Sequence, residues 1–160
     1  MKKFYFAIAL LFVVLNGALA QSTSLTPGVD IMSRYIWRGL NLGGASPSLQ
    51  PSLEFTYSKL TLGTWGAFAT GNNFIVQETD LYVTYTPVDP FSVTLTDYFL
   101  ADELAGNNHY FDFREDSTVH LLELSASFNG SDKIPFTFLA AINFWGADAR
   151  NAENKKQYST

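Results

Sequence analysis

The chain has 160 residues, of which 47 % are hydrophobic, 16 % are aromatic and only 16 % are charged, and its formal net charge is -5. An ordinary soluble domain carries about 25 % charged residues, so this chain is unusually poor in charge. The acidic balance argues against a nucleic-acid partner, and the absence of cysteine excludes disulfides and a lipoprotein anchor.

The first twenty residues have the pattern of a secretory signal peptide. Lys2 and Lys3 precede the apolar run FYFAIALLFVVL at 4–15, and ALA at 18–20 is a small-x-small cleavage site. The apolar run is shorter than the roughly 20 residues that a membrane-spanning helix needs, and no later stretch is long enough either. We therefore expect residues 1–20 to be a removed signal peptide and the mature protein to be exported; together with the alternation described next, this predicts a location in the outer membrane.

After the signal, the sequence consists of short segments in which apolar and polar residues alternate. Leu53, Phe55 and Tyr57, for example, alternate with Ser52, Glu54 and Thr56. Segments of about ten residues with this period are typical of outer-membrane β-barrels, although a soluble β-sandwich has the same period. The seven predicted strands are 29–40, 52–59, 60–69, 76–86, 91–100, 118–128 and 135–145.

The connections between these strands alternate in length. If the first strand runs outward from the periplasm, the outer connections are 41–51, 70–75 and 101–117, and the periplasmic ones are Ser58–Lys59, 87–90 and 129–134. Bacterial barrels have short periplasmic turns and longer outer loops, whereas a sandwich predicts no such alternation. The predicted fold class is therefore all-β, an antiparallel transmembrane up-and-down β-barrel over 21–160.

The strand count suggests that this barrel is incomplete. Seven is odd, whereas single-chain bacterial barrels have an even number of strands. We expect the sequence to be the N-terminal part of a longer barrel.

The stretch SRYIWRGLNLGG at 33–44 places cations and large aromatics in opposite phases of the first predicted strand. This alternation predicts that Arg34 and Arg38 face the lumen. Tyr35 and Trp37 would then face lipid at the membrane interface, where amphipathic rings are favoured. Trp145 is predicted to be a third aromatic at this interface.

Acidic residues on other strands are predicted to lie at the same level as the two arginines. The predicted lumenal charge cluster consists of Arg34, Arg38, Glu78, Asp80, Asp97 and Glu123. Such a cluster is either a selectivity filter or an ion-pair network that fills a narrow barrel. Asp97 shares its phase with Phe91, Val93 and Leu95, so its lumenal position requires a bulge, unless Asp97 lies above the hydrocarbon.

The sequence contains no pattern that favours an enzyme. His120 and Glu123 are three residues apart and point to opposite faces of a strand, and no G-x-S-x-G motif is present. Acidic residues in the loop 101–117 do not have the spacing of a calcium-binding EF-hand. We therefore expect no catalytic residue, no cofactor and no metal site.

Several stretches together resemble the TorF-type porins, a bacterial outer-membrane family, in the style of its Bacteroidetes members. They are VDIMSRYIWRGLNLGG, PSLQPSLEF, LGTWGAF, ETDLYVTYT, VTLTDYF and HLLELSASF. The resemblance implies a barrel with a channel role, with outer-membrane lipid and small polar solutes as partners, and supplies no functional residues. Two alternatives stay open: a non-conducting structural or adhesion barrel, and a secreted carbohydrate-binding sandwich.

Overall fold

The computed structural model describes residues 23–71, 77–101, 109–149 and 155, so the predicted signal peptide lies outside the described residues. The described chain is all-β and is dominated by one antiparallel sheet of seven strands, in the order β1-β4-β5-β6-β7-β8-β9. These strands are β1 (Thr23–Met32), β4 (Ser48–Tyr57), β5 (Leu60–Ala69), β6 (Gln77–Val88), β7 (Phe91–Ala101), β8 (His120–Phe128) and β9 (Phe138–Gly146). A two-stranded hairpin, β2 (Ile36–Trp37) and β3 (Leu40–Asn41), and a short 3-10 helix, η2 (Ala147–Ala149), complete the structure.

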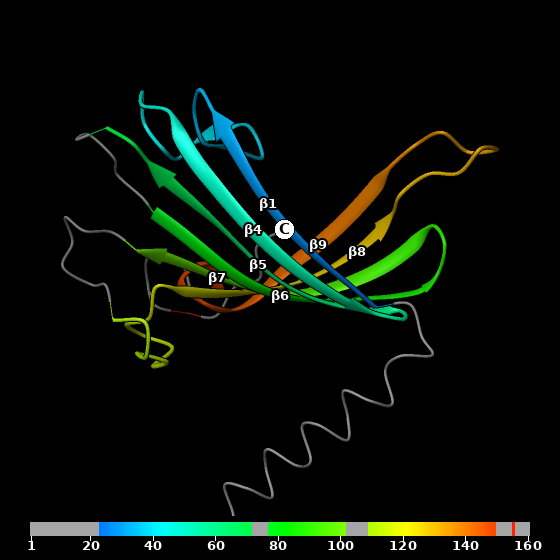
Figure 1. Cartoon of the computed structure of the whole chain (residues 1–160). Coiled ribbons are helices and arrows are strands. Elements are labelled where there is room, and N and C mark those ends of the chain that lie inside the picture. Colours follow the sequence, from blue (N-terminus) through cyan, green and yellow to red (C-terminus); the bar gives the residue numbers. More distant parts are fainter. Residues whose placement is uncertain (1–22, 72–76, 102–108, 150–154, 156–160) are drawn as a thin grey trace, which may run out of the picture.

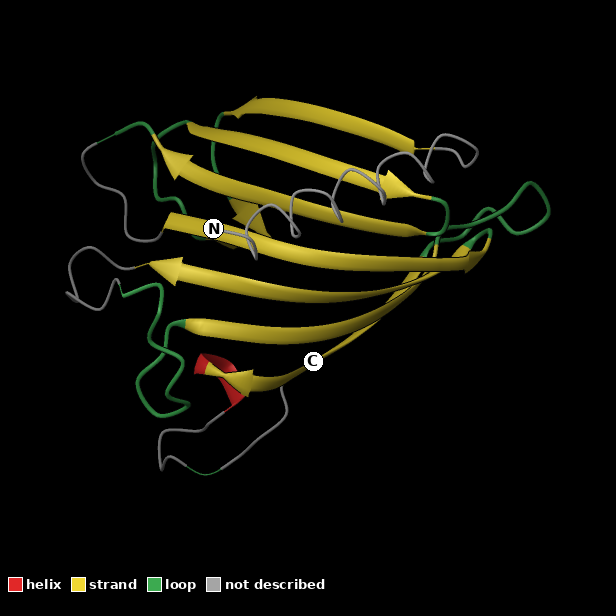
Figure 2. Ribbon diagram, turned by 60° about the horizontal axis from the view of Figure 1, so that its bottom comes forward, coloured by secondary structure: helices red, strands yellow, loops and turns green. Residues whose placement is uncertain are grey.

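Each strand of the sheet pairs with its neighbour in the sequence, apart from β1, which pairs with β4 across the hairpin. The sheet is strongly curved (Figure 1), and the seven strands run side by side along it (Figure 2). None of the helices in the described part of the chain has the length and apolarity needed to cross a membrane.

The predicted strands equal the strands of the large sheet in number, but the hairpin β2–β3 is not predicted and the strand ends differ. The prediction 60–69 agrees with β5, whereas the first strand is 23–32 and not 29–40. The second strand begins at Ser48 rather than residue 52. Pro51 has no backbone N–H, and the ladder between β4 and β5 is interrupted there, between the pairs Leu49–Phe68 and Ser52–Trp65.

The connections at one end of the sheet are shorter on average than those at the other end. One end has the tight turns 58–59 and 89–90 and the longer connection 129–137. The other end has the connections 33–47, 70–76 and 102–119. The described part of 102–119 folds at the left end of the sheet in Figure 2. The predicted grouping of the connections is therefore correct.

The two faces of the sheet differ sharply in polarity. We call the face that carries Glu54, Asp80, Thr96, Glu123 and Asn143 the inner face, and the opposite face the outer face. The pairing register places these inner-face residues in the same phase across the sheet. Buried polar side chains on the inner face are Ser48, Gln50, Glu78, Asp80, Thr96, Glu123, Ser125 and Asn143.

The outer face is apolar and exposed. Its large exposed side chains include Leu53, Phe55, Leu62, Leu81, Val83, Tyr85, Phe91, Val93, Leu95 and Leu124. In a water-soluble protein the apolar side chains are the buried ones. In this sheet the arrangement is inverted, because the buried side chains are mostly polar and the exposed ones are mostly apolar.

Candidate functional site on the inner face of the sheet

The hairpin β2–β3 forms because the chain reverses direction at Arg38 and Gly39. Both residues have positive φ, 46° and 86°. Two consecutive residues with positive φ are characteristic of a type I′ hairpin turn, and glycine adopts this region without strain. The carbonyl of Tyr35 accepts hydrogen bonds from the backbone N–H groups of Leu42 and Gly43, so that the segment 35–43 is a closed unit.

Tyr35 fixes the start of this hairpin segment to the inner face. Its side chain is only 3 % exposed, and its hydroxyl donates a hydrogen bond to Glu78 Oε2 on β6. The ring packs against Trp65 of β5, with 5.5 Å between the ring centroids. Burial, and secondly the hydrogen bond to Glu78, raise the pKa of Tyr35 above its ordinary value. The phenol is therefore held in its neutral, donating form.

Arg38 and Trp37 fix the turn of the hairpin further across the sheet. Arg38 Nη2 lies 2.7 Å from Glu123 Oε2 and 2.8 Å from Glu123 Oε1, and so forms an ion pair with β8. The Arg38 guanidinium also lies 4.5 Å from the centre of the Trp37 ring. The Trp37 ring meets Tyr98 of β7 edge-on at 6.1 Å. The hairpin thus contacts β5, β6, β7 and β8, and it lies across the inner face.

A second polar contact spans the middle of the inner face. Gly63 lies between Glu54 and Tyr82 in the pairing register, and a Cβ atom at Gly63 would meet the Tyr82 ring at 2.1 Å. The absence of a side chain at Gly63 therefore lets Tyr82 lie across β5. Its hydroxyl donates to Glu54 Oε1 at 2.6 Å.

Only some of the carboxylate oxygens on the inner face have hydrogen-bond donors. Tyr98 donates to Glu123 Oε1 at 3.1 Å. Asp80 is 6 % exposed, and its Oδ1 atom is buried without a hydrogen-bond partner among the described residues. Burying a carboxylate oxygen without a hydrogen-bond donor lowers the stability of the fold. The buried position of Asp80 is therefore not explained by a contribution to stability.

A cavity of about 170 Å³ lies between the hairpin and the inner face. It is lined by Trp37, Leu40, Leu42, Glu78, Tyr98, Leu100 and Leu121. The lining is mainly apolar, with the Glu78 carboxylate and the Tyr98 hydroxyl as its polar groups. Its volume is similar to that of cavities that hold one benzene-sized molecule.

Asp97 and His120 form a separate pair, which lies on the outer face. Asp97 is in the same phase as Phe99, which pairs with His120, and His120 Nδ1 lies 2.8 Å from Asp97 Oδ1. The His120 Nε2 atom lies 2.7 Å from the carbonyl oxygen of Tyr110. Because a carbonyl only accepts, Nε2 must carry a proton. His120 is 0 % exposed and is a structural histidine that connects the β7–β8 loop to the sheet.

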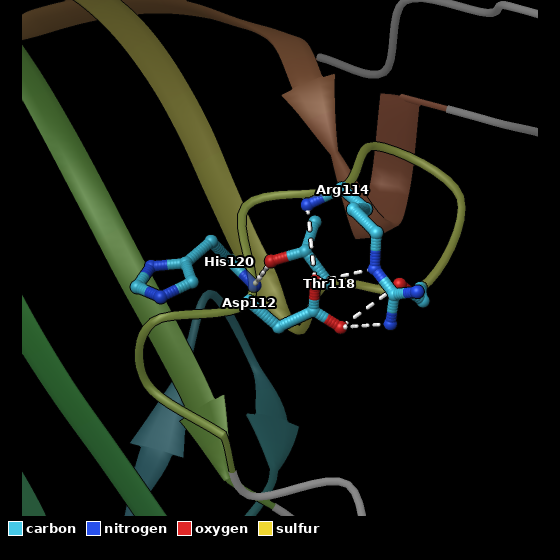
Figure 3. A network of polar contacts seen from close by, with 5 residues as sticks. Asp112, Arg114, Thr118 and His120 are labelled. Atoms are coloured by element: carbon cyan, nitrogen blue, oxygen red, sulfur yellow. Dashed lines mark hydrogen bonds and ion pairs between the residues drawn. The ribbon is translucent and has the colours of Figure 1, made fainter.

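The described part of this loop, 109–119, is folded around Asp112 (Figure 3). Both carboxylate oxygens of Asp112 accept hydrogen bonds from the Arg114 guanidinium, each at 2.9 Å. These bonds lower the pKa of Asp112 below its usual range. Thr118 Oγ1 accepts a hydrogen bond from the backbone N–H of His120 at 3.0 Å, and the Phe113 ring stacks on His120 at 4.8 Å.

Four residues of the predicted charge cluster come together on the inner face, and two do not. Arg38, Glu78, Asp80 and Glu123 all lie on this face or contact it. Arg34 is exposed and belongs to no ion pair among the described residues. The prediction that Asp97 is lumenal is wrong, because Asp97 continues the regular alternation of β7 on the outer face and pairs with His120 there.

The predicted outward orientation of Tyr35 and Trp37 is also wrong. Strand β1 ends at Met32, and the chain then folds inward, so the alternation of a continuous strand does not apply to 33–41. Trp145 pairs with Leu122 next to a register shift between β8 and β9 and lies on the outer face; its location at a membrane interface stays a prediction.

The sequence did not reveal the contacts between Tyr82 and Glu54 or between Asp97 and His120. Both depend on the register of strand pairs, which a single sequence does not supply. Within the described ranges, no group of three or more His, Cys, Asp or Glu side chains is placed to hold a metal ion. Residues 102–108 of the acidic loop 101–117, which include Asp102 and Glu103, lie outside those ranges.

Comparison with known proteins identifies one family. A family model described as "Bacterial protein of unknown function (Gcw_chp)" matches residues 17–145, which include the whole sheet apart from the last residue of β9. No curated protein and no solved structure matches the chain. The chain belongs to the Gcw_chp family of bacterial proteins.

Proposed function

We propose that this protein is a bacterial outer-membrane β-barrel whose inner face lines a path for small polar solutes. The observation that carries the proposal is the inverted polarity of the sheet, with buried polar side chains on one face and exposed apolar side chains on the other. Water would penalise such an outer face, and monomeric soluble proteins rarely expose apolar patches larger than a few hundred Å². Lipid solvates such a face favourably.

The lengths of the strands support the same proposal. The seven strands have between 9 and 12 residues, and a tilted transmembrane strand needs about 9–11 residues. In hydrocarbon every backbone group must be paired. In the proposed barrel the outward edges of β1 and β9 are therefore paired with further strands, within the chain or from another copy.

The inner face supports a passage for solutes. Its buried polar side chains are carboxylates, hydroxyls and amides, and Trp65, Leu100 and Leu121 add apolar surface near the hairpin. This end is narrowed by the hairpin β2–β3, whose segment contacts Glu78 and Glu123. A polar lumen with a narrow charged section is the arrangement that sorts permeating solutes in channels. The resemblance of the sequence to TorF-type porins points in the same direction.

A second candidate function is a non-conducting structural or adhesion barrel. It is favoured by the same hairpin, because Tyr35, Trp37 and Arg38 fill much of the inner face at its end of the sheet. In that case the connections at this end would carry the function, and the inner polar contacts would only stabilise the barrel.

Single-channel recording distinguishes the two candidates. Purified full-length protein, refolded in detergent, is added to a planar lipid bilayer in KCl solution. The channel proposal predicts stepwise increases in conductance that boiled protein does not produce. If the protein inserts into liposomes, as judged by flotation and by a boiling-dependent shift on a denaturing gel, but gives no conductance, the structural role replaces the channel role. If it does not associate with lipid at all, the barrel proposal is wrong.

A further inference from the structure

Among Asp, Glu, Lys and Arg, the seven strands of the sheet carry only acidic side chains. The six acidic side chains on these strands, all of which the structure describes, are Asp30, Glu54, Glu78, Asp80, Asp97 and Glu123. None of the seven strands contains Lys or Arg. Asp97 faces outward and pairs with His120, so five carboxylates remain on the inner face.

Four of these carboxylates occupy successive levels along the inner face, where a level is a row of residues that pair with one another across neighbouring strands. Glu78 is level with Ala67 and Leu100, and Asp80 is level with Trp65 and Tyr98. The next level contains Glu54 and Glu123, which are connected through Gly63, Tyr82 and Thr96 in the register. Consecutive levels on one face of a strand are about 7 Å apart. A cation that moves along the inner face therefore meets a carboxylate at each level.

The only cationic side chain that contacts these carboxylates in the described part of the chain is Arg38. It forms its ion pair with Glu123, while Glu54 and Glu78 each accept a hydrogen bond from a neutral tyrosine hydroxyl. Glu78 and Asp80 are hydrogen-bonded to one another and share a proton, so they count as one negative charge beside Glu54 and Glu123. One arginine does not balance these three charges, and the inner face has an excess of negative charge.

Asp80 provides an independent indication of a bound cation. Its side chain is more than nine-tenths buried on the inner face between the levels of Glu78 and Glu54. The carboxyl group shares a hydrogen bond with Glu78, but its Oδ1 atom has no hydrogen-bond partner among the described residues. A buried carboxylate oxygen of this kind is stabilised when a cation, or an ammonium group that donates a hydrogen bond, occupies the adjacent space.

We propose that the inner face selects cations, and that its solutes are monovalent cations and small organic ammonium ions rather than anions. This inference rests on the proposed channel function and specifies its substrate class. Acidic rings produce cation selectivity in channels by raising the local concentration of cations and by repelling anions. Arg38 opposes this preference and limits it at the hairpin.

The test is the reversal potential of the full-length protein in a planar bilayer that separates two KCl concentrations. The expected result is a permeability ratio of K⁺ to Cl⁻ above one. Glu54→Gln should lower this ratio by about two- to fourfold, the weight of one charge at roughly 5 Å across water. Gln at this position still offers a carbonyl oxygen to the Tyr82 hydroxyl, so the contact across Gly63 is retained.

The matched control is Asp132→Asn, which removes one carboxylate from the exposed connection between β8 and β9 and should leave the ratio unchanged. A conducting channel with a ratio at or below one would overturn the cation inference and leave the channel proposal intact. Equal effects of the two variants would also overturn it, because the selectivity would then follow total charge and not the inner face. A protein that inserts but never conducts contradicts both proposals.

Discussion

A charge placed on the outer face distinguishes lipid from water as the solvent of the sheet. Val83 lies in the middle of β6, pairs with Leu62 and Leu95 on the neighbouring strands, and is 40 % exposed. In water, Val83→Arg would replace an exposed apolar side chain by a charged one, and such surface changes usually alter the free energy of unfolding by no more than about 0.5 kcal/mol. In lipid, the same substitution near the membrane midplane costs about 2–4 kcal/mol. This cost corresponds to an approximately 30- to 900-fold decrease in the folding equilibrium constant.

The assay is reversible folding into liposomes across a urea series, followed by the boiling-dependent shift of the folded form on a denaturing gel. The control is Thr84→Arg, which places the same charge at the neighbouring inner-face position of the same strand. It removes only the hydrogen bond between Thr84 and Thr94, which contributes about 0.5–1.5 kcal/mol. We expect Val83→Arg to be clearly the more destabilising of the two. Equal effects, or a stabilised Val83→Arg protein, would refute the assignment of the outer face to lipid.

Three further predictions concern the hairpin and the sheet. Tyr35→Phe removes the donor to buried Glu78 and should cost about 1.5–3 kcal/mol, read as a lower urea midpoint; an unchanged midpoint would show that this hydrogen bond does not hold the hairpin. Because the pKa of Tyr35 is raised above 10.0 in the folded state, its contribution to stability is complete below pH 10 and is lost as the pH rises further. Tryptophan fluorescence should report this loss in an alkaline titration, because Trp65 packs on the Tyr35 ring. Tyr35→Phe should weaken the transition, and an unchanged transition would assign it to Tyr82 and Tyr98, which also donate to glutamates. Gly146→Ala should destabilise the sheet by about 1–3 kcal/mol, because φ is +95° and the new Cβ would lie 2.0 Å from the His120 carbonyl oxygen; a wild-type thermal midpoint would contradict this.

The alternation of apolar and polar residues was sufficient to predict the sheet. The predicted strands after the first each overlap one strand of the large sheet, whereas the first, 29–40, covers the end of β1 and part of the hairpin β2–β3. The polar phase predicted for β6 puts Glu78 and Asp80 on one face, as the structure does. The signal is strong because each strand has one apolar and one polar face, so that a shift of one residue would exchange them.

The hairpin could not be predicted in the same way. The segment 33–44 alternates like a strand, and its turn consists of Arg38–Gly39 rather than the Asn-Gly or Asp-Gly pairs that signal a type I′ turn. Tyr35 and Trp37 were therefore read as interface aromatics, although the structure places them against Glu78 and Tyr98. Position in the fold, and not residue type, decides whether such an aromatic faces lipid or a polar lumen.

The position of Asp97 was ambiguous in the sequence for a different reason. Its phase indicated the apolar face, and its charge indicated the polar one. The structure resolves the conflict through His120, whose Nδ1 atom lies within hydrogen-bond distance of the Asp97 carboxylate under the loop 109–119. A pairing partner 23 residues away in the sequence is not visible before the register is known.

The claim that the outer face contacts lipid is tested most directly by site-directed spin labelling along β7. The chain contains no cysteine, so single cysteines at positions 92–95 carry a nitroxide at one site each. In the liposome-bound protein, we predict that labels at Val93 and Leu95 collide mainly with oxygen, which is concentrated in lipid. Labels at Ser92 and Thr94 should collide mainly with a water-soluble nickel chelate. Equal access of the chelate to all four positions would contradict the membrane-embedded sheet.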